Sequence, residues 1–204
     1  MNIDKYKIEK VSKATCKEFL MKYHYLSRQG YGFRSGQNYG LFEGDRLIGV
    51  AIFHGVSAWE TIKGCFGLKN KEQEGFWELG RLAMDPKCKV KNLTSWFLSK
   101  TMKLMRQEAR PRAIITYADA DYHHGYIYQA CNFTYHGLSA QKNDFWVKQP
   151  DGTYKKCSRG RPRDVEGEWR PRTRKHRYLK VYDKKLKTLW PTMPYPKGDN
   201  MVYE

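Results

Sequence analysis

Hydrophobic positions divide the first part of the chain into a strand, a helix and a hairpin. Residues 7–11 alternate as a short strand does, and the apolar positions that follow recur at helical spacing as far as Tyr23. Two apolar runs on either side of a Glu-Gly-Asp cluster predict a β-hairpin over residues 39–55. Residues 56–74 are mixed and polar, which indicates a loop or a short helix.

The next stretch alternates again between strand and helix patterns. It predicts a strand over 76–86, an amphipathic helix over 92–108, a buried strand over 113–119, a short helix over 125–130, and strands over 133–139 and 144–148. Asn92 is a suitable N-cap for the long helix, and Asn132 suits the left-handed conformation that often ends a helix. This order predicts a mixed α/β (α+β) fold with one central sheet flanked by helices.

Composition and cysteine usage exclude several classes of protein. The chain has no run of about 18 apolar residues, so we expect no membrane-spanning helix and no membrane partner. The first ten residues lack the apolar segment of a signal peptide, and the five cysteines are scattered, without the paired spacing of a structural zinc site. A reducing, cytoplasmic compartment fits this cysteine usage.

Basic residues outnumber acidic ones and gather near the C-terminus. The net charge of +17, from 38 Lys and Arg against 21 Asp and Glu, indicates a polyanionic partner. Residues 148–187 alone carry fifteen basic and five acidic side chains. The sequence therefore predicts a catalytic domain over residues 1–148 and a basic extension over residues 149–204, which packs on that domain and binds DNA.

A basic loop between the strand that ends at Pro86 and the long helix is a candidate cofactor site. Backbone N–H groups at the start of a helix are unpaired and attract anions. Lys89, Val90, Lys91 and Asn92 occupy this position, and the two lysines add positive charge. A plain strand-loop-helix unit is the alternative.

Asp119 and Tyr128 are the first candidates for catalysis. Asp119 ends the buried strand, and ligands bind at the carboxyl ends of strands in open α/β sheets. A carboxylate there would orient or deprotonate a nucleophile, and the phenol of Tyr128, on the next helix, would donate a proton to a leaving group. The alternatives are a helix-capping role for Asp119 and a packed helical tyrosine for Tyr128.

The same segments resemble the GNAT acyltransferase superfamily. The strand ELGRLAMDP, the helix after Asn92 and the strand ITYAD follow its layout, and YQACNF, which starts at Tyr128, parallels its Tyr-x-x-x-Gly-Phe motif. The resemblance implies that Tyr128 acts as the acid toward the thiolate of coenzyme A. Residues 87–95 lack the superfamily's Gly-rich pyrophosphate loop. An aminoacyl carrier such as aminoacyl-tRNA is therefore an alternative to acetyl-CoA as the acyl donor.

A narrower resemblance is to the phage Mom family of DNA-modification proteins. It rests on KYHYLSR, ELGRLAMD, YADADYHHGYIYQACNF and the C-terminal KHRYLK and WPTMPYPK, and it covers most of the chain. It implies a phage-encoded protein that acts in the host cytoplasm. It further implies that the adenine N6 amine in double-stranded DNA is converted to a carbamoylmethyl form, so that the modified DNA resists restriction enzymes.

The Mom resemblance adds His24, Tyr25 and Tyr39 to the catalytic candidates. The exocyclic amine of adenine is a poor nucleophile, so a base such as His24 or Asp119 would assist it. His24 and Tyr25 are alternatively metal ligands, although a pair offers fewer ligands than metal sites usually have. His123 lies in a polar stretch, where we expect solvation or hydrogen bonding.

The C-terminal extension contains two basic motifs. Residues 159–163, Arg-Gly-Arg-Pro-Arg, are similar to the core of an AT-hook, which lies in an A·T-rich minor groove. Residues 169–180 interleave aromatic and cationic side chains, which suits phosphate contacts and stacking. The predicted DNA contacts are Arg159, Arg161, Arg163, Arg170, Arg172, Arg174, Lys175 and Arg177. A solvated basic loop is the alternative for the first motif.

Three functions compete on the sequence alone. The first is DNA-adenine modification of the Mom type, and the second is a GNAT-like acyltransferase that acts on tRNA or on a protein amine. The third is a non-catalytic DNA-binding protein. Catalysis on DNA predicts that replacing Asp119 or Tyr128 abolishes modification and leaves DNA binding intact.

Overall fold

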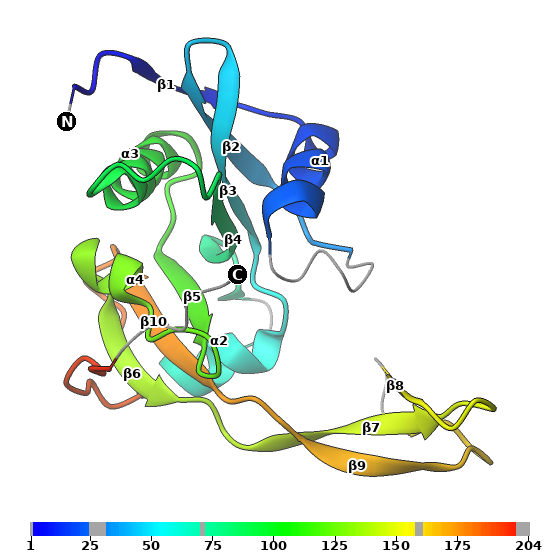
Figure 1. Cartoon of the computed structure of the whole chain (residues 1–204). Helices are drawn as coiled ribbons and strands as arrows, with labels where there is room; N and C mark the ends of the chain where they lie inside the picture. Colours follow the sequence, from blue (N-terminus) through cyan, green and yellow to red (C-terminus); the bar gives the residue numbers. More distant parts are fainter. Residues whose placement is uncertain (1, 25–31, 70–71, 158–160, 199–204) are drawn as a thin grey trace.

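The computed structural model describes residues 2–24, 32–69, 72–157 and 161–198, and its centre is a seven-stranded sheet (Figure 1). The strands of this sheet are β1 (Tyr6–Lys10), β2 (Gln37–Glu43), β3 (Arg46–Gly55), β4 (Phe76–Met84), β5 (Ala113–Asp119), β6 (Thr134–Leu138) and β10 (Lys175–Val181). Their order is β1-β2-β3-β4-β5-β10-β6. β4 and β5 run parallel, whereas the other neighbouring strands run antiparallel. The predicted mixed α/β class is confirmed.

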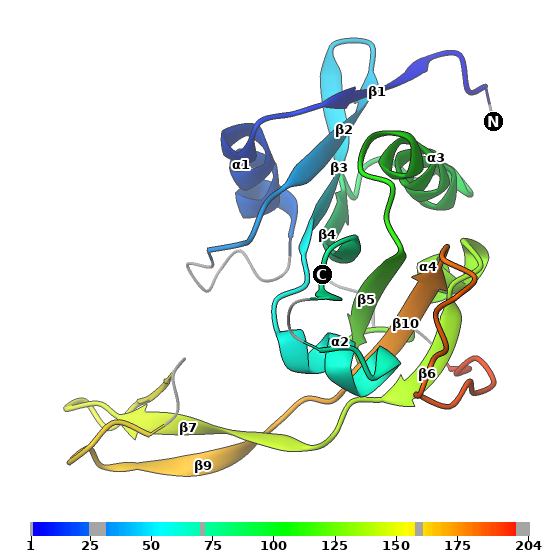
Figure 2. The same ribbon diagram turned by 180° about the vertical axis from the view of Figure 1, so that it is seen from behind.

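Helices cover both faces of the sheet. They are α1 (Lys13–Tyr23), α2 (Trp59–Phe66), α3 (Leu93–Glu108) and α4 (Tyr126–Ala130). α3 and α4 pack on one face, against residues such as Phe53 and Ile114. α1 and α2 pack on the other, against Ile52 and Ile115 (Figures 1 and 2). In the described part of the chain, no helix is long and apolar enough to cross a membrane.

β4 and β5 pair over only part of their length. Their parallel register ends at Leu79 opposite Thr116, where Thr116 Oγ1 donates a hydrogen bond to the Leu79 carbonyl at 3.0 Å. Further on, β4 stays with β3 and β5 stays with β10. The register of β4 against β3 also shifts by one residue at Gly80, where a larger side chain would collide with the His54 ring. The two strands therefore diverge toward their carboxyl ends.

A second sheet, here named the arm, reaches away from the central sheet (Figure 1). It consists of β7 (Lys142–Lys148), β8 (Tyr154–Lys156) and β9 (Gly167–Arg172), in the order β8-β7-β9. The Ser139 amide donates to the Lys175 carbonyl at 2.8 Å, and Gln141 Nε2 donates to the Arg172 carbonyl at 2.9 Å. The arm thus prolongs the β6–β10 ribbon.

The structure differs from the expected division of the chain after residue 148. β10 belongs to the stretch 149–204, yet it lies inside the central sheet, between β5 and β6. Its Tyr178 and Leu179 are fully buried, although basic residues precede and follow them in the sequence. Because of those basic residues, the sequence pattern did not reveal β10 as a core strand. The C-terminal part of the chain contributes β8 and β9 to the arm and β10 to the central sheet.

Candidate active site

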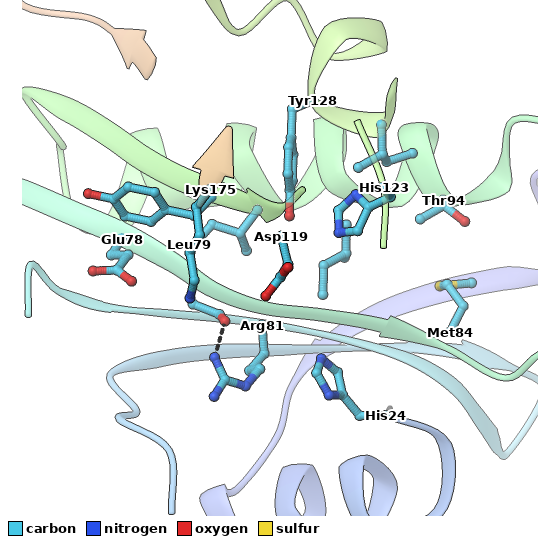
Figure 3. Close-up of a pocket in the computed structure, with 14 residues that line it drawn as sticks. His24, Glu78, Leu79, Arg81, Met84, Thr94, Asp119, His123, Tyr128 and Lys175 are labelled. Carbon is cyan, nitrogen blue, oxygen red and sulfur yellow. Dashed lines mark hydrogen bonds between the residues drawn. The ribbon is translucent and has the colours of Figure 1, made fainter. Parts of the chain in front are cut away.

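A pocket of about 330 Å³ opens where β4 and β5 diverge (Figure 3). β4 contributes its segment from Glu78 to Met84, and β5 contributes Tyr117 and Asp119. The start of α3, α4, the end of α1, the loop after β5 and the first residue of β10 form the other walls. Three of the five residues predicted for catalysis, His24, Asp119 and Tyr128, line this pocket. They come from three different elements, and the fold brings them together.

Asp119 is the last residue of β5 and lies directly opposite Lys175 in the β5–β10 register. Its carboxylate accepts a hydrogen bond from the Asp121 amide at 3.2 Å. Burial raises the pKa of Asp119, and the positive charge of Lys175 partly offsets this effect. A carboxylate with a raised pKa is a stronger base than an ordinary one, and therefore a better proton acceptor.

Tyr128 points from α4 toward Asp119 (Figure 3). α4 starts after Gly125, which has a left-handed φ of 75°, and the Tyr128 ring packs between those of Phe133 and Tyr178 at centroid distances of 5.9 and 5.4 Å. Burial raises the pKa of the Tyr128 phenol, and a hydrogen bond with Thr116 works against that rise. The phenol therefore keeps its proton at neutral pH and is a proton donor.

His24 closes α1, where its amide donates to the Leu20 carbonyl at 2.8 Å. Burial, followed by the charges of Arg81 and His123, lowers the pKa of His24 to about 4. The ring is neutral near pH 7 and is a weaker base than an ordinary imidazole. Tyr25 lies outside the described residues, and within the described ranges no group of three or more His, Cys, Asp or Glu side chains is placed to hold a metal.

Two cations in the pocket were not predicted there. Arg81 follows the bulge in β4, and its Nη1 donates to the Gly80 carbonyl at 2.6 Å. Lys175 was assigned to DNA contacts, but the β5–β10 register places it beside Asp119. Loss of water contact lowers the pKa of Lys175, and Asp119 opposes this. The signal for Arg81 was visible in the sequence as a charged residue within the apolar run ELGRLAM.

His123 also lines the pocket, although the sequence suggested only a loop role for it. Its Nδ1 accepts a hydrogen bond from the Gly125 amide at 3.2 Å, which ties the loop after β5 to the start of α4. Burial lowers the pKa of His123. The ring therefore stays neutral near pH 7, and it helps to fix the entry into the helix that carries Tyr128.

The predicted cofactor loop lies at the start of α3, next to the pocket. Asn92 occupies the N-cap position with a left-handed φ of 64°, and its side chain makes no capping hydrogen bond with the described residues. Lys89, Val90 and Lys91 are exposed beside it, and Thr94 in the first turn lines the pocket. Asn92 was expected to cap through its side chain. The structure instead leaves this helix start open, which suits an anion.

Tyr39 does not belong to this pocket. It is 1% exposed in the core under α3, and its hydroxyl donates to Glu108 Oε2 at 2.8 Å. Burial and the Glu108 charge raise its pKa. The hairpin position was predicted correctly, but the side chain points to the opposite end of α3 from the pocket residue Thr94. Its role in the structure is to pack and to hydrogen-bond.

The predicted DNA contacts divide into exposed and internally bonded residues. Arg159 lies outside the described residues, whereas Arg161 and Arg163 are exposed beside the arm. Arg174 Nε donates to the Ser139 carbonyl at 2.7 Å. Arg177 Nη2 donates to the His136 carbonyl at 2.6 Å, and its guanidinium stacks 4.3 Å from the Trp190 ring centroid.

Arg170 and Arg172 lie on β9 and contact other arm residues. Arg170 pairs with Glu168 at 2.5 Å, and Arg172 pairs with the nearly buried Asp144. The Arg172–Asp144 pair joins β9 to β7, whereas the Arg170–Glu168 pair lies within β9. The sequence pattern of alternating aromatic and cationic residues therefore reflects, in part, the construction of the arm and of β10.

Comparison with solved structures confirms the GNAT-like fold. A GNAT family acetyltransferase from Elizabethkingia anophelis with acetyl-CoA bound superposes with a TM-score of 0.51 at 12% identity, covering 88% of this chain and 99% of that one. An IAA acetyltransferase from Bacillus cereus gives 0.51 at 13% identity, with coverages of 87% and 99%. A ribosomal-protein-S5-alanine acetyltransferase from Vibrio fischeri gives 0.52 at 10% identity, with coverages of 92% and 98%.

The narrower resemblance seen in the sequence is also confirmed. No curated protein sequence matched the chain. The model of the Mom protein family, in contrast, matches residues 5–197, a span that includes the pocket, the arm and β10. The chain therefore belongs to the Mom protein family.

Proposed function

We propose that this protein is a transferase that converts the N6 amine of adenine in double-stranded DNA to a carbamoylmethyl form. The observation that carries the proposal is the convergence of Asp119, Tyr128 and His24 in the pocket between β4 and β5. Transfer of a group to an amine needs one side chain that accepts a proton and another that donates one. The environments of Asp119 and Tyr128 suit these two roles.

Asp119 is the proton acceptor in this mechanism. The adenine nitrogen forms a bond to the transferred carbon while the bond between that carbon and the donor breaks, and the proton that the nitrogen loses passes to the Asp119 carboxylate. Burial raises the pKa of Asp119 and lowers that of His24 to about 4, so burial strengthens Asp119 as a base and weakens His24. His24 then serves to orient the substrate from the opposite wall.

Tyr128 is the proton donor to the leaving group. Its phenol remains protonated at neutral pH because burial raises its pKa. Arg81 and Lys175 add positive charge to the same pocket, which stabilises negative charge that develops on the leaving atom. The volume of about 330 Å³ lies within the usual range for ligand pockets, and a base in a duplex must leave the stack to enter it.

A coenzyme A derivative is the carrier that the start of α3 suits best. The open start of α3, with Lys89 and Lys91 exposed beside Asn92, suits a pyrophosphate, and Thr94 connects this position to the pocket. Coenzyme A would supply a thioester, whose thiolate is a good leaving group. Attack of the N6 amine on a thioester carbonyl would form an N6–C(=O) amide, whereas the carbamoylmethyl product has an N6–CH2 bond and an additional amide nitrogen. Acyl transfer alone therefore does not give the product, and the labelling experiment must distinguish a coenzyme A thioester from aminoacyl-tRNA as the source of the two carbons and the nitrogen.

Mass spectrometry of nucleosides tests the proposal. Plasmid DNA from cells that express the wild-type protein is expected to contain N6-carbamoylmethyl-deoxyadenosine, and DNA from cells with Asp119→Asn or Tyr128→Phe is expected to lack it. Tyr39→Phe removes a phenol outside the pocket and is the matched control. Isotope-labelled acetyl and glycyl precursors then identify the donor.

Two results would overturn the proposal. One is unmodified deoxyadenosine throughout the DNA in the presence of soluble wild-type protein, and the other is full modification by the Asp119→Asn and Tyr128→Phe variants. Turnover of labelled acetyl-CoA on tRNA or on a protein amine, without DNA modification, would instead support the second function considered from the sequence.

A further inference from the structure

The register of the arm separates its side chains into two faces. Residues directly opposite one another in neighbouring strands point to the same side, and successive residues alternate. We name the faces after one residue each. The Asp144 face carries Lys142, Asp144, Trp146, Lys148, Tyr154, Lys156, Glu168, Arg170 and Arg172, and the Trp169 face carries Asn143, Phe145, Val147, Lys155, Gly167, Trp169 and Pro171.

Charges on the Asp144 face are largely neutralised within the arm. The ion pairs are Asp144 with Arg172 and with Lys156, Glu168 with Arg170, and Glu166 with Lys148. The Arg170 guanidinium also lies between two aromatic rings, 4.8 Å from the centroid of Trp146 and 4.6 Å from that of Tyr154. This face is occupied by contacts that hold the arm together.

The Trp169 face differs in charge and in exposure. None of its strand positions is acidic, whereas Lys155 lies on it and the Arg161 guanidinium lies over it, 5.6 Å from the Phe145 ring centroid. Trp169 is 53% exposed, while Phe145 beneath it is 2% exposed. A large apolar ring and cations thus project from the arm on the same side.

Trp169 is also held in position from below. Its ring meets Phe145 edge-on, with centroids 5.3 Å apart at 65°, directly across the β7–β9 ladder. Gly167 leaves the space that the Phe145 ring occupies, since a Cβ at that position would lie 2.8 Å from the ring. The exposed indole therefore rests on a packed base and is pre-oriented to meet a partner.

We propose that the Trp169 face is the surface that the arm applies to the minor groove of DNA, where Trp169 inserts between two base pairs and bends the duplex. The inference rests on the proposed function, because it takes DNA as the partner. Proteins that enter the minor groove combine cations with apolar wedges that unstack a base step. Lys155, Arg161 and Trp169 supply this combination on one face of a ribbon.

The arm is long enough for one duplex to contact both Trp169 and the pocket. Six residues along the chain lead from Trp169 to Lys175, which spans at most about 22 Å of extended backbone. That length corresponds to about six base-pair steps. A bend at Trp169 would thus fall within one helical turn of the adenine that enters the pocket.

A second copy of the chain is the competing occupant of this face. A stable interface needs about 800 Å² from each partner, which is much more than one exposed indole provides. Two Trp169 faces would also bring like charges together. Charge complementarity therefore favours the polyanion.

Fluorescence measurements on a duplex of roughly 30 base pairs test the inference. Energy transfer between dyes at the two ends reports bending, and anisotropy reports affinity at several salt concentrations. The wild-type protein is expected to increase energy transfer. Trp169→Ala is expected to lose most of this increase and to bind at least about fivefold more weakly, with an unchanged salt slope because no charge is removed. Trp169→Phe should retain part of the bending.

Trp59→Ala is the matched control, since Trp59 is 38% exposed on α2, which is not part of the arm. It should bind and bend DNA as the wild type does. The inference is overturned if the wild type does not bend DNA, or if Trp169→Ala bends it equally. It is also overturned if Trp169→Ala converts a dimer to a monomer in light scattering and leaves bending intact.

The same samples separate this inference from the proposed function. Bending that depends on Trp169, without any modified nucleoside, would refute the proposed function and support the assignment of the face. Detection of the modified nucleoside, together with bending that is unchanged in Trp169→Ala, would support the proposed function and refute the assignment of the Trp169 face.

Discussion

Tyr39 and Tyr128 are both buried and were both predicted as catalytic residues, but their surroundings differ, and we expect different effects when each is replaced. Tyr39 donates a hydrogen bond to Glu108, which also pairs with Lys10 at 2.9 Å. Tyr39→Phe leaves that carboxylate without its neutral donor, so we expect a loss of about 1–3 kcal/mol in the free energy of unfolding, with modification retained. Urea denaturation and nucleoside mass spectrometry measure the two effects.

Tyr128→Phe is expected to behave in the opposite way. The ring keeps its packing against Phe133 and Tyr178, so the free energy of unfolding should change by less than about 1 kcal/mol. Modification should be lost because the proton donor is gone. A Tyr128→Phe variant that modifies DNA normally would show that the phenol is only a packed residue.

We expect Asp119 and Lys175 to make the proposed reaction depend on pH in a defined direction. Asp119 accepts a proton only as the carboxylate, so the single-turnover rate should fall as the pH drops through its pKa, which burial holds above the ordinary value. Lys175 lowers that pKa through its charge. Lys175→Met should therefore shift the acid limb of the pH profile to higher pH.

Lys175→Arg provides the control for this profile. It keeps the positive charge opposite Asp119, so the acid limb should stay close to that of the wild type. Identical acid limbs in the wild type and Lys175→Met would contradict the electrostatic effect of Lys175 on Asp119 and would leave Lys175 as one of the predicted DNA contacts.

Part of the site could be predicted from local sequence patterns, whereas the rest depends on the pairing of strands that lie far apart in the sequence. Asp119 was found because it ends an apolar strand, and Tyr128 because a short helix follows. Lys175 was missed as a pocket residue because its neighbour Asp119 lies 56 positions earlier, and only the β5–β10 pairing brings them together. Tyr39 does not line the pocket, and the sequence could not show this because a hairpin pattern does not reveal which face a strand turns toward a site.

At the scale of elements, α4 depends on a glycine that leaves room for two rings. Gly125 has φ +75°, and a Cβ there would lie 2.7 Å from Tyr178 Cε2 and 3.0 Å from Tyr128 Cδ2. Gly125→Ala therefore combines backbone strain with overpacking, and we expect it to cost about 2–4 kcal/mol of stability. It should also displace Tyr128 and reduce modification.

Gly44→Ala measures the cost of placing a Cβ on a left-handed backbone without any crowding by neighbouring side chains. Gly44 has φ +57°, and its Cβ would meet no atom within 4 Å. The expected loss is only about 1–2 kcal/mol, with modification unchanged. Denaturation curves of the two variants compare the costs directly, and equal losses of stability and activity would refute the crowding argument.

The elements themselves were predictable where a single pattern dominated. β4, α3 and β5 have clear apolar periodicity, and the structure has them within a few residues of the expected bounds. α2 was left open between loop and helix because residues 56–74 mix both signals. β9 and β10 were not recognised as strands, because basic residues interrupt the apolar alternation and suggested a nucleic-acid-binding segment instead.

For the whole molecule, the net charge of +17 overstates the charge that is available to DNA. Lys180 Nζ donates to the Asn132 carbonyl at 2.8 Å, and Arg174 and Arg177 donate to carbonyl groups of β6 and the residue after it. These cations stabilise the sheet around β10. The cations whose side chains are free of such internal bonds are the better candidates for DNA contacts, and Arg161 and Arg163 are exposed near the arm.

This distribution leads to a prediction about salt dependence. Each phosphate contact that is lost lowers the slope of log affinity against log salt by about 0.9. The double variant Arg161→Ala/Arg163→Ala should therefore reduce the slope by roughly two units and leave the unfolding temperature unchanged. Arg177→Met should lower the unfolding temperature, because Arg177 bonds to the His136 carbonyl and stacks on Trp190, and it should leave the slope intact. Anisotropy titrations and thermal denaturation distinguish the two. If Arg177→Met changed the slope and the double variant did not, the DNA path would run along β10 and not along the arm.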